Sequence, residues 1–141
     1  MSTPPTHALA ARNRRQFRNI HVTQIVRYRL PPSGWVSILH RVSGAALFLL
    51  LPLLLWLFDL SLMSELSFAR LQEAASHGFV KLVLLGAIWA FLHHLVAGVR
   101  YLLLDLQVGI DKRAARKSAI AVLAISLPLT LLAALPLFGV V

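Results

Sequence analysis

AALFLLLPLLLWL, residues 45–57, contains no charged side chain and forms the core of the first of three long apolar stretches. The stretches cover about residues 35–58, 79–104 and 119–140, and each approaches the ~20 apolar residues that a helix needs to cross a bilayer. Pro52 lies inside the first stretch, where we expect it to kink the helix, because neighbouring helices tolerate such breaks. The sequence therefore predicts an all-α fold of three transmembrane helices.

Composition over the whole chain agrees with a membrane protein. Of the 141 residues, 58% are hydrophobic and 13% are charged. A soluble domain of this size needs a largely polar surface to stay dispersed. Cysteine is absent, which excludes disulfides and thiolate metal sites. The sequence shows no nucleophile–base pair and no glycine-rich phosphate loop, so we expect no hydrolytic or phosphate-transfer chemistry.

Positive charge is concentrated at two places in the chain, whose net charge is +9. Seven arginines precede or open the first apolar stretch, at positions 12, 14, 15, 18, 27, 29 and 41. Four basic residues precede the third stretch, namely Lys112, Arg113, Arg116 and Lys117. The connector of residues 59–78 holds more acid than base, namely Asp59, Glu65 and Glu73 against Arg70. Because Lys and Arg gather on the cytoplasmic side, we expect a cytoplasmic N-terminus and a C-terminus on the outer side.

The basic runs flank apolar stretches, so membrane orientation explains them better than nucleic-acid binding, and we expect no nucleic-acid partner. We divide the chain into a basic cytoplasmic arm, residues 1–33, and a three-helix transmembrane domain, residues 34–141. No secretory signal is apparent. The arm shares its arginines and lack of acid with mitochondrial transit peptides, but it is poor in Ser and joins the first helix without a break. We therefore favour a bacterial inner membrane over a mitochondrial inner membrane.

A cluster of polar side chains marks the start of the first apolar stretch. Ser37, His40 and Arg41 are spaced three and four residues apart, so they project to one side of a helix at the water–lipid boundary. Polar side chains there are costly unless they bind something or reach the headgroups. This side of the helix can hydrogen-bond a small polar head group whose tail stays in lipid.

Two adjacent histidines, His93 and His94, lie deep in the second stretch, roughly 15 Å from its cytoplasmic end at 1.5 Å per residue. Adjacent helical residues point about 100° apart, so one helix cannot aim both at the same iron. His94 shares its side with Gly98, where the missing side chain lets a flat macrocycle or another helix approach. For His94 we favour haem ligation over interhelical hydrogen bonding, and for His93 the order is reversed.

The expected depths of the remaining histidines bear on the second ligand of such a haem. We expect His40 near the cytoplasmic surface, His77 in the outer connector, and His7 and His21 in the arm, so apart from its neighbour His93 no histidine reaches the depth of His94. A six-coordinate haem then requires a second membrane subunit to supply the opposite ligand. The two haem propionates need cationic partners, for which His40, Arg41 and Arg100 are the candidates. For Arg100, extension to lipid phosphates is an equal alternative.

Two motifs resemble a known family over about residues 18–117. They read SILHRVSG at residues 37–44 and HLVAGVR at residues 94–100, followed by Asp105. Together they resemble the cytochrome b membrane-anchor subunit of succinate dehydrogenase (complex II). The resemblance implies that His94 is an axial ligand of haem b, that Ser37 and Arg41 line the ubiquinone pocket, and that His40 and Arg41 lie near the propionates. The family often has His where this chain has Tyr101.

The resemblance also implies partners. A second membrane-anchor subunit would supply the other axial histidine, while an iron–sulfur subunit with its clusters and a flavoprotein with its flavin would deliver electrons from succinate to ubiquinone. Ser37 would donate a hydrogen bond to a quinone carbonyl, and Arg41 would stabilise developing negative charge. This subunit would not itself oxidise succinate. The alternatives are an anchor of a quinol–fumarate reductase and a non-redox anchor in which His93 and His94 only pack helices.

Overall fold

The computed structural model describes residues 21, 23 and 27–140, and this part of the chain is helical apart from short connections. Four helices follow one another: α3 (Pro32–Met63), α4 (Glu65–Ser76), α5 (Gly78–Asp105) and α6 (Lys112–Leu137). Helices α3, α5 and α6 are each long and apolar enough to cross a membrane. The predicted all-α fold with three spans is confirmed. Most of the predicted arm, residues 1–33, lies outside the described residues.

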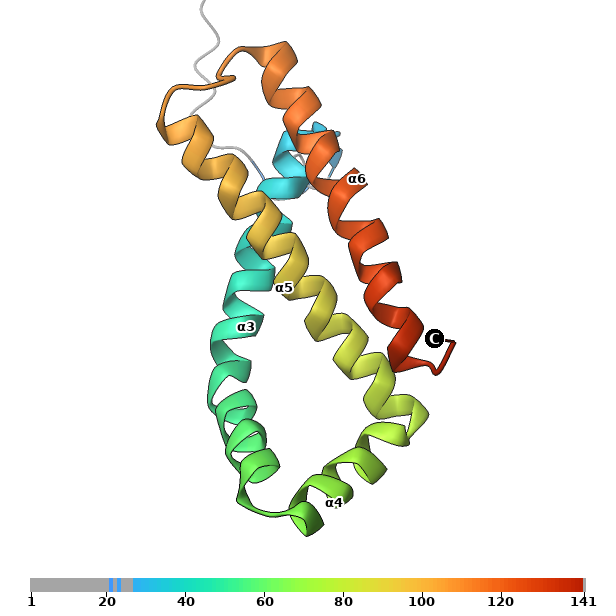
Figure 1. Cartoon of the computed structure of the whole chain (residues 1–141). Coiled ribbons are helices and arrows are strands. Elements are labelled where there is room, and N and C mark those ends of the chain that lie inside the picture. The colour runs from blue at the N-terminus through green and yellow to red at the C-terminus, as the bar shows by residue number, and fades with distance from the viewer. Residues whose placement is uncertain (1–20, 22, 24–26, 141) are drawn as a thin grey trace, which may run out of the picture.

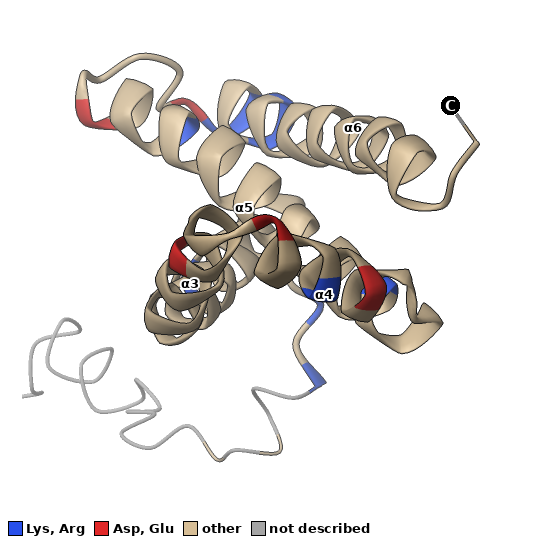
Figure 2. Cartoon of the chain, turned by 60° about the horizontal axis from the view of Figure 1, so that its bottom comes forward, with Lys and Arg blue, Asp and Glu red and all other residues tan. Residues whose placement is uncertain are grey.

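Helix α5 is the central helix, with α6 packed along one side and α3 against another (Figure 1). The long helices alternate in direction, so α3 and α6 begin at the end of the molecule where α5 stops (Figure 1). We call this the basic end, because four Lys and Arg residues gather in the first turns of α6, whereas Asp and Glu occur at both ends of the molecule (Figure 2). The buried core, Val36, Ala97, Ala119 and Val122, joins the three helices toward the basic end.

Helices α3 and α6 begin before the apolar stretches from which the sequence predicts them. Helix α3 begins at Pro32, whose fixed φ suits a first helical turn, and continues through Pro52 to Met63. Helix α6 begins well before the predicted residue 119, because the Asp111 carboxylate caps it, accepting hydrogen bonds from the N–H groups of Arg113 at 2.9 Å and Ala114 at 3.0 Å. Capping residues are polar, so a hydropathy pattern does not register them.

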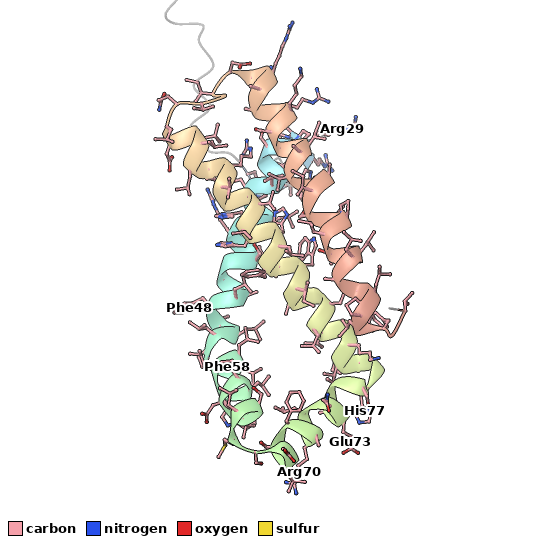
Figure 3. The ribbon with its side chains drawn as sticks, viewed as in Figure 1. Arg29, Phe48, Phe58, Arg70, Glu73 and His77 are labelled. Carbon is pink, nitrogen blue, oxygen red and sulfur yellow. The ribbon has the colours of Figure 1, made fainter. Side chains whose placement is uncertain are left out.

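Helix α4 is a short amphipathic helix in the connector for which the sequence predicts no element. Ser64 and Ser67 form a capping box, with each backbone N–H donating to the other hydroxyl at 3.1 Å. Figure 3 shows Arg70, Glu73 and His77 at the end of the molecule opposite the basic end. Twelve residues are too few to cross a bilayer. The helix instead bridges α3 and α5 where these two have separated (Figure 1).

The outer surface of the long helices is apolar. Phe48 and Phe58 on α3 point outward, and 74% and 63% of their surfaces are exposed (Figure 3). Similar exposure recurs along α5 and α6, for example at Phe79 and Leu131. In water this surface would be strongly unfavourable, whereas lipid chains cover it at no such cost. The chain is a membrane protein.

Candidate functional site

The contact between α3 and α5 contains the same pattern, His-x-x-x-Gly, on both helices. His40 and Gly44 lie on α3, and His94 and Gly98 lie on α5. Because the two helices are antiparallel, each histidine faces the glycine of the other: a Cβ at Gly44 would lie 2.7 Å from His94 Cε1, and one at Gly98 would lie 3.7 Å from His40 Nε2. The two imidazole rings stack, with centroids 4.1 Å apart and planes 4° from parallel. The missing side chains make the room that this pair occupies.

The stacked pair brings His40 and His94 to the same level of the bundle. We expect His40 near the cytoplasmic surface and both His93 and His94 deeper, but the rings of His40 and His94 are in direct contact. Helix α3 already begins at Pro32, which places His40 about 12 Å from the start of its helix, while His94 is about 16 Å from the end of α5. The early start of α3 therefore places His40 well inside a helix, level with His94.

Stacking does not make His40 the opposite ligand of a shared metal. Two axial imidazoles direct nitrogen atoms at one metal from opposite sides, through bonds of about 2 Å. The face-to-face rings of His40 and His94 present their π surfaces to one another instead. In the structure, the ring of His40 therefore supports the ring of His94 by stacking on it.

The hydrogen bonds of His94 select one tautomer. Its Nδ1 lies 3.0 Å from the carbonyl oxygen of His40 and 3.4 Å from Oγ of Ser43. A carbonyl oxygen only accepts, so Nδ1 carries the proton and the lone pair of the neutral ring is on Nε2. The buried Ser43 hydroxyl donates to the same carbonyl at 3.0 Å. A backbone carbonyl that holds one ring nitrogen while the other stays available is the usual arrangement of a metal-ligating histidine.

His93 is in a different environment from His94. Its side chain is 0% exposed, and its ring stacks on Trp89 with centroids 5.4 Å apart. The backbone of Val36 is close, but neither ring nitrogen has a well-formed hydrogen bond within the described residues. His93 is therefore part of the buried core of the helix bundle, whereas half-buried His94 can be reached by a group outside this chain.

Arg100 connects α5 to α6. Its side chain is 7% exposed, and its guanidinium donates from Nε to Oγ of Ser118 at 2.9 Å and from a terminal nitrogen to the carbonyl of Ala115 at 3.2 Å. The guanidinium also lies 5.3 Å from the ring of Tyr101. In this conformation Arg100 holds the basic ends of two helices together and does not extend to the lipid headgroups.

The remaining candidate residues surround the stacked pair. The Tyr101 ring lies 4.9 Å from that of His40, and its hydroxyl is buried without a hydrogen-bond partner among the described residues. Half-buried Ser37 and exposed Arg41 occupy the α3 turns that flank His40. The structure thus brings His40, His94 and Tyr101 into contact, with Ser37 and Arg41 beside them on α3.

Sequence reasoning gave no role to Ser43 or Gly44, or to Ser118 as the partner of Arg100. A usable signal was present for the first two residues. The repeated His-x-x-x-Gly pattern on two antiparallel helices places each small residue opposite a ring. Ser118 carried no such signal, because its pairing with Arg100 depends on how α5 and α6 align.

Comparison with known proteins identifies the family. Residues 13–133 match the family of the succinate dehydrogenase/fumarate reductase transmembrane subunit. The chain is 36% identical over 103 residues to the succinate dehydrogenase cytochrome b556 subunit of Coxiella burnetii, covering 72% of this chain and 82% of that relative. It is 32% identical over 111 residues to the subunit of the same name in Paracoccus denitrificans, covering 79% and 85%. The chain therefore belongs to the succinate dehydrogenase/fumarate reductase transmembrane subunit family, as a cytochrome b membrane-anchor subunit.

Proposed function

We propose that this chain binds haem b through His94 and forms part of the quinone-reduction site of a succinate–ubiquinone oxidoreductase. The observation that carries the haem assignment is the 3.0 Å contact between His94 Nδ1 and the His40 carbonyl. It leaves Nε2 as the available nitrogen on a half-buried ring in the membrane part of the bundle. The relatives' name, cytochrome b556, is consistent with a b-type haem. Bound haem b supplies one-electron redox chemistry.

Cationic residues near His94 are suited to bind the two propionates of haem b. His40 and Arg41 are the proposed contacts of the haem propionates. Arg100 is a third, because two of the five N–H groups of its guanidinium are engaged with α6 and the others remain. A second membrane-anchor subunit would supply the other histidine that holds the haem, since His40 stacks on His94.

The quinone site is assigned to Ser37 and Arg41. Ser37 donates a hydrogen bond to a carbonyl of ubiquinone, and Arg41 stabilises the negative charge that develops on the head group. Arg41 is exposed in the isolated chain, so a substrate or a partner subunit can reach it. The isoprenoid tail remains in lipid beside the apolar surface of α3.

The remaining parts of the reaction lie in partner subunits. A flavoprotein oxidises succinate, and an iron–sulfur subunit passes the electrons on to the quinone site. Both dock on the basic end, which faces the cytoplasm of a bacterium across its inner membrane. The relatives named above are succinate dehydrogenase subunits, which favours succinate oxidation over fumarate reduction as the physiological direction.

A reduced-minus-oxidised spectrum of the purified complex tests the proposal. His94→Ala should abolish or strongly shift the b-type bands, because it removes the ligating nitrogen. His93→Phe is the matched control: it keeps an aromatic ring against Trp89 but has no ring nitrogens, so the bands should persist. Loss of the bands in both variants, in complexes that still assemble, would contradict the assignment of His94.

A further inference from the structure

A pocket at the basic end is separate from the histidine pair. Its volume is about 310 Å³, and its walls come from two helix starts: Pro31, Pro32 and Ser33 at α3, and Lys112 and Arg116 at α6. None of these residues takes part in the proposed haem or quinone chemistry. The pocket therefore needs an explanation of its own.

The pocket is strongly electropositive. Lys112 and Arg116 are exposed cations on adjacent turns of α6. The start of α3 has neither a side-chain cap nor an acidic residue in its first turn, so the positive end of its dipole also faces an anion placed here. Asp111, the carboxylate nearest in sequence, already accepts two backbone hydrogen bonds as the cap of α6.

An apolar strip continues from the pocket along α6. Ile120, Leu127 and Leu131 follow Arg116 on the same side of the helix, and their side chains are 48%, 51% and 68% exposed. The positive pocket lies where α3 and α6 begin, and the strip lies along the apolar length of α6 that is suited to cross a membrane. A ligand that fills both has an anionic head and an apolar tail.

We propose that the pocket binds the phosphate of an anionic phospholipid whose acyl chain lies along Ile120, Leu127 and Leu131. Basic pockets between transmembrane helices are suited to anionic head groups. Inorganic phosphate shares the head-group chemistry but gains nothing from the apolar strip. The site does not depend on haem or quinone binding, so it stands apart from the proposed function.

The test uses the assembled complex with the full chain, depleted of lipid in neutral detergent. Dioleoyl phosphatidylglycerol, dioleoyl phosphatidylcholine and inorganic phosphate are added in separate samples. Native mass spectrometry counts retained lipid, and the Tm follows stabilisation by binding. Phosphatidylglycerol should bind and raise the Tm, and the other two should have little effect. In the double variant Lys112→Gln/Arg116→Gln its affinity should fall by about tenfold or more, because each basic residue near a lipid surface contributes roughly a factor of five.

The matched control is Arg113→Gln/Lys117→Gln, which removes the same charge from the same turns of α6 but outside the pocket lining. It should retain most of the affinity. If the first double variant does not assemble, Arg116→Gln replaces it and Arg116→Lys should restore binding. Three outcomes would contradict the proposal. Equal losses of affinity in the two double variants would assign binding to general surface charge. Equal stabilisation by inorganic phosphate and by phosphatidylglycerol would show that the site binds phosphate and not a lipid. Unchanged lipid binding with loss of a partner subunit would assign the pocket to an acidic segment of that subunit.

Discussion

At the scale of single residues, the histidine pair depends on two glycines, whose missing side chains leave room for the rings. Gly44 and Gly98 each leave space for an imidazole from the opposite helix, and the two spaces differ in size. A ring held on one face by a stacked partner and at Nδ1 by a carbonyl has little freedom to rotate. The orientation of His94 is therefore a property of α3 as well as of its own helix.

Gly44→Ala should reduce haem content or shift the b-type bands. The added Cβ would lie 2.7 Å from His94 Cε1, closer than real carbon contacts, so the ring or the helices must move. Overpacking of this kind typically costs about 1–3 kcal/mol. The measurement is the haem-to-protein ratio and the reduced spectrum of the assembled complex. Gly98→Ala is the control, because its Cβ meets His40 at an ordinary 3.7 Å. Equal effects of the two substitutions would show that the close approach at Gly44 is unimportant.

Ser37→Ala and Arg41→Ala should each lower succinate–ubiquinone activity by roughly ten- to a hundredfold. The reason is the loss of a hydrogen bond to a charged or developing charge, which typically contributes about 1.5–3 kcal/mol. Succinate oxidation by an artificial acceptor that takes electrons upstream should survive, and both assays are made on the same membrane-bound complex. A parallel fall in both activities would mean that the residues hold the complex together. No fall in either would place the quinone pocket elsewhere.

At the scale of helices, the polar caps position the apolar spans. Asp111 starts α6 and Pro32 starts α3, and these starting points set which side chains meet across the interfaces. Arg100 then joins α5 to α6 through Ser118 and Ala115 near the same end. The basic end is the well-connected part of the bundle, while α3 and α5 separate toward α4 (Figure 1).

Asp111→Ala should destabilise the complex, because α6 loses the acceptor of two backbone N–H groups. Loss of such a cap costs about 0.5–2 kcal/mol. The shift in Tm of the purified complex measures it. Asp105→Ala removes a carboxylate from the last turn of α5, where negative charge opposes the helix dipole, so it should leave the Tm unchanged or raise it. A larger loss at Asp105 than at Asp111 would contradict the capping role.

At the scale of the whole molecule, the chain is an open bundle with an apolar exterior and an excess of positive charge at one end. Within the described residues, basic side chains outnumber acidic ones at the end where α6 begins, whereas Asp59, Glu65 and Glu73 give the α4 side a small excess of acid (Figure 2). This asymmetry favours one orientation in the membrane, with the basic end in the cytoplasm. The exposed apolar surface is the area that lipid and partner subunits cover.

Reporter insertions should place Ala115 in the cytoplasm and Ser67 outside it. The four basic residues at the start of α6 and the acidic connector of α4 are the physical reason. An alkaline phosphatase insertion at Ser67 should be active, and one at Ala115 should be inactive, with a fluorescent protein giving the opposite pattern. A cytoplasmic signal from Ser67 would overturn the proposed orientation.

Sequence patterns alone predicted the three spans, the second of them to within one residue at each end. They also singled out His94, Gly98 and the motif that contains His40, and they separated His94 from His93 by direction. The reason is that hydropathy and helical periodicity are local: about twenty apolar residues span a bilayer wherever they occur, and adjacent residues always diverge by about 100°.

Only the tertiary structure decided which side chains meet. The place of His40 well inside α3 follows from the start of that helix at Pro32, and its stacking on His94 follows from the alignment of two antiparallel helices. The same alignment turns Gly44 into the space for His94, and packing of α5 on α6 directs Arg100 to Ser118. Each of these contacts joins residues that are far apart in sequence or on different helices. Their geometry depends on caps and interhelical packing, which no local pattern contains.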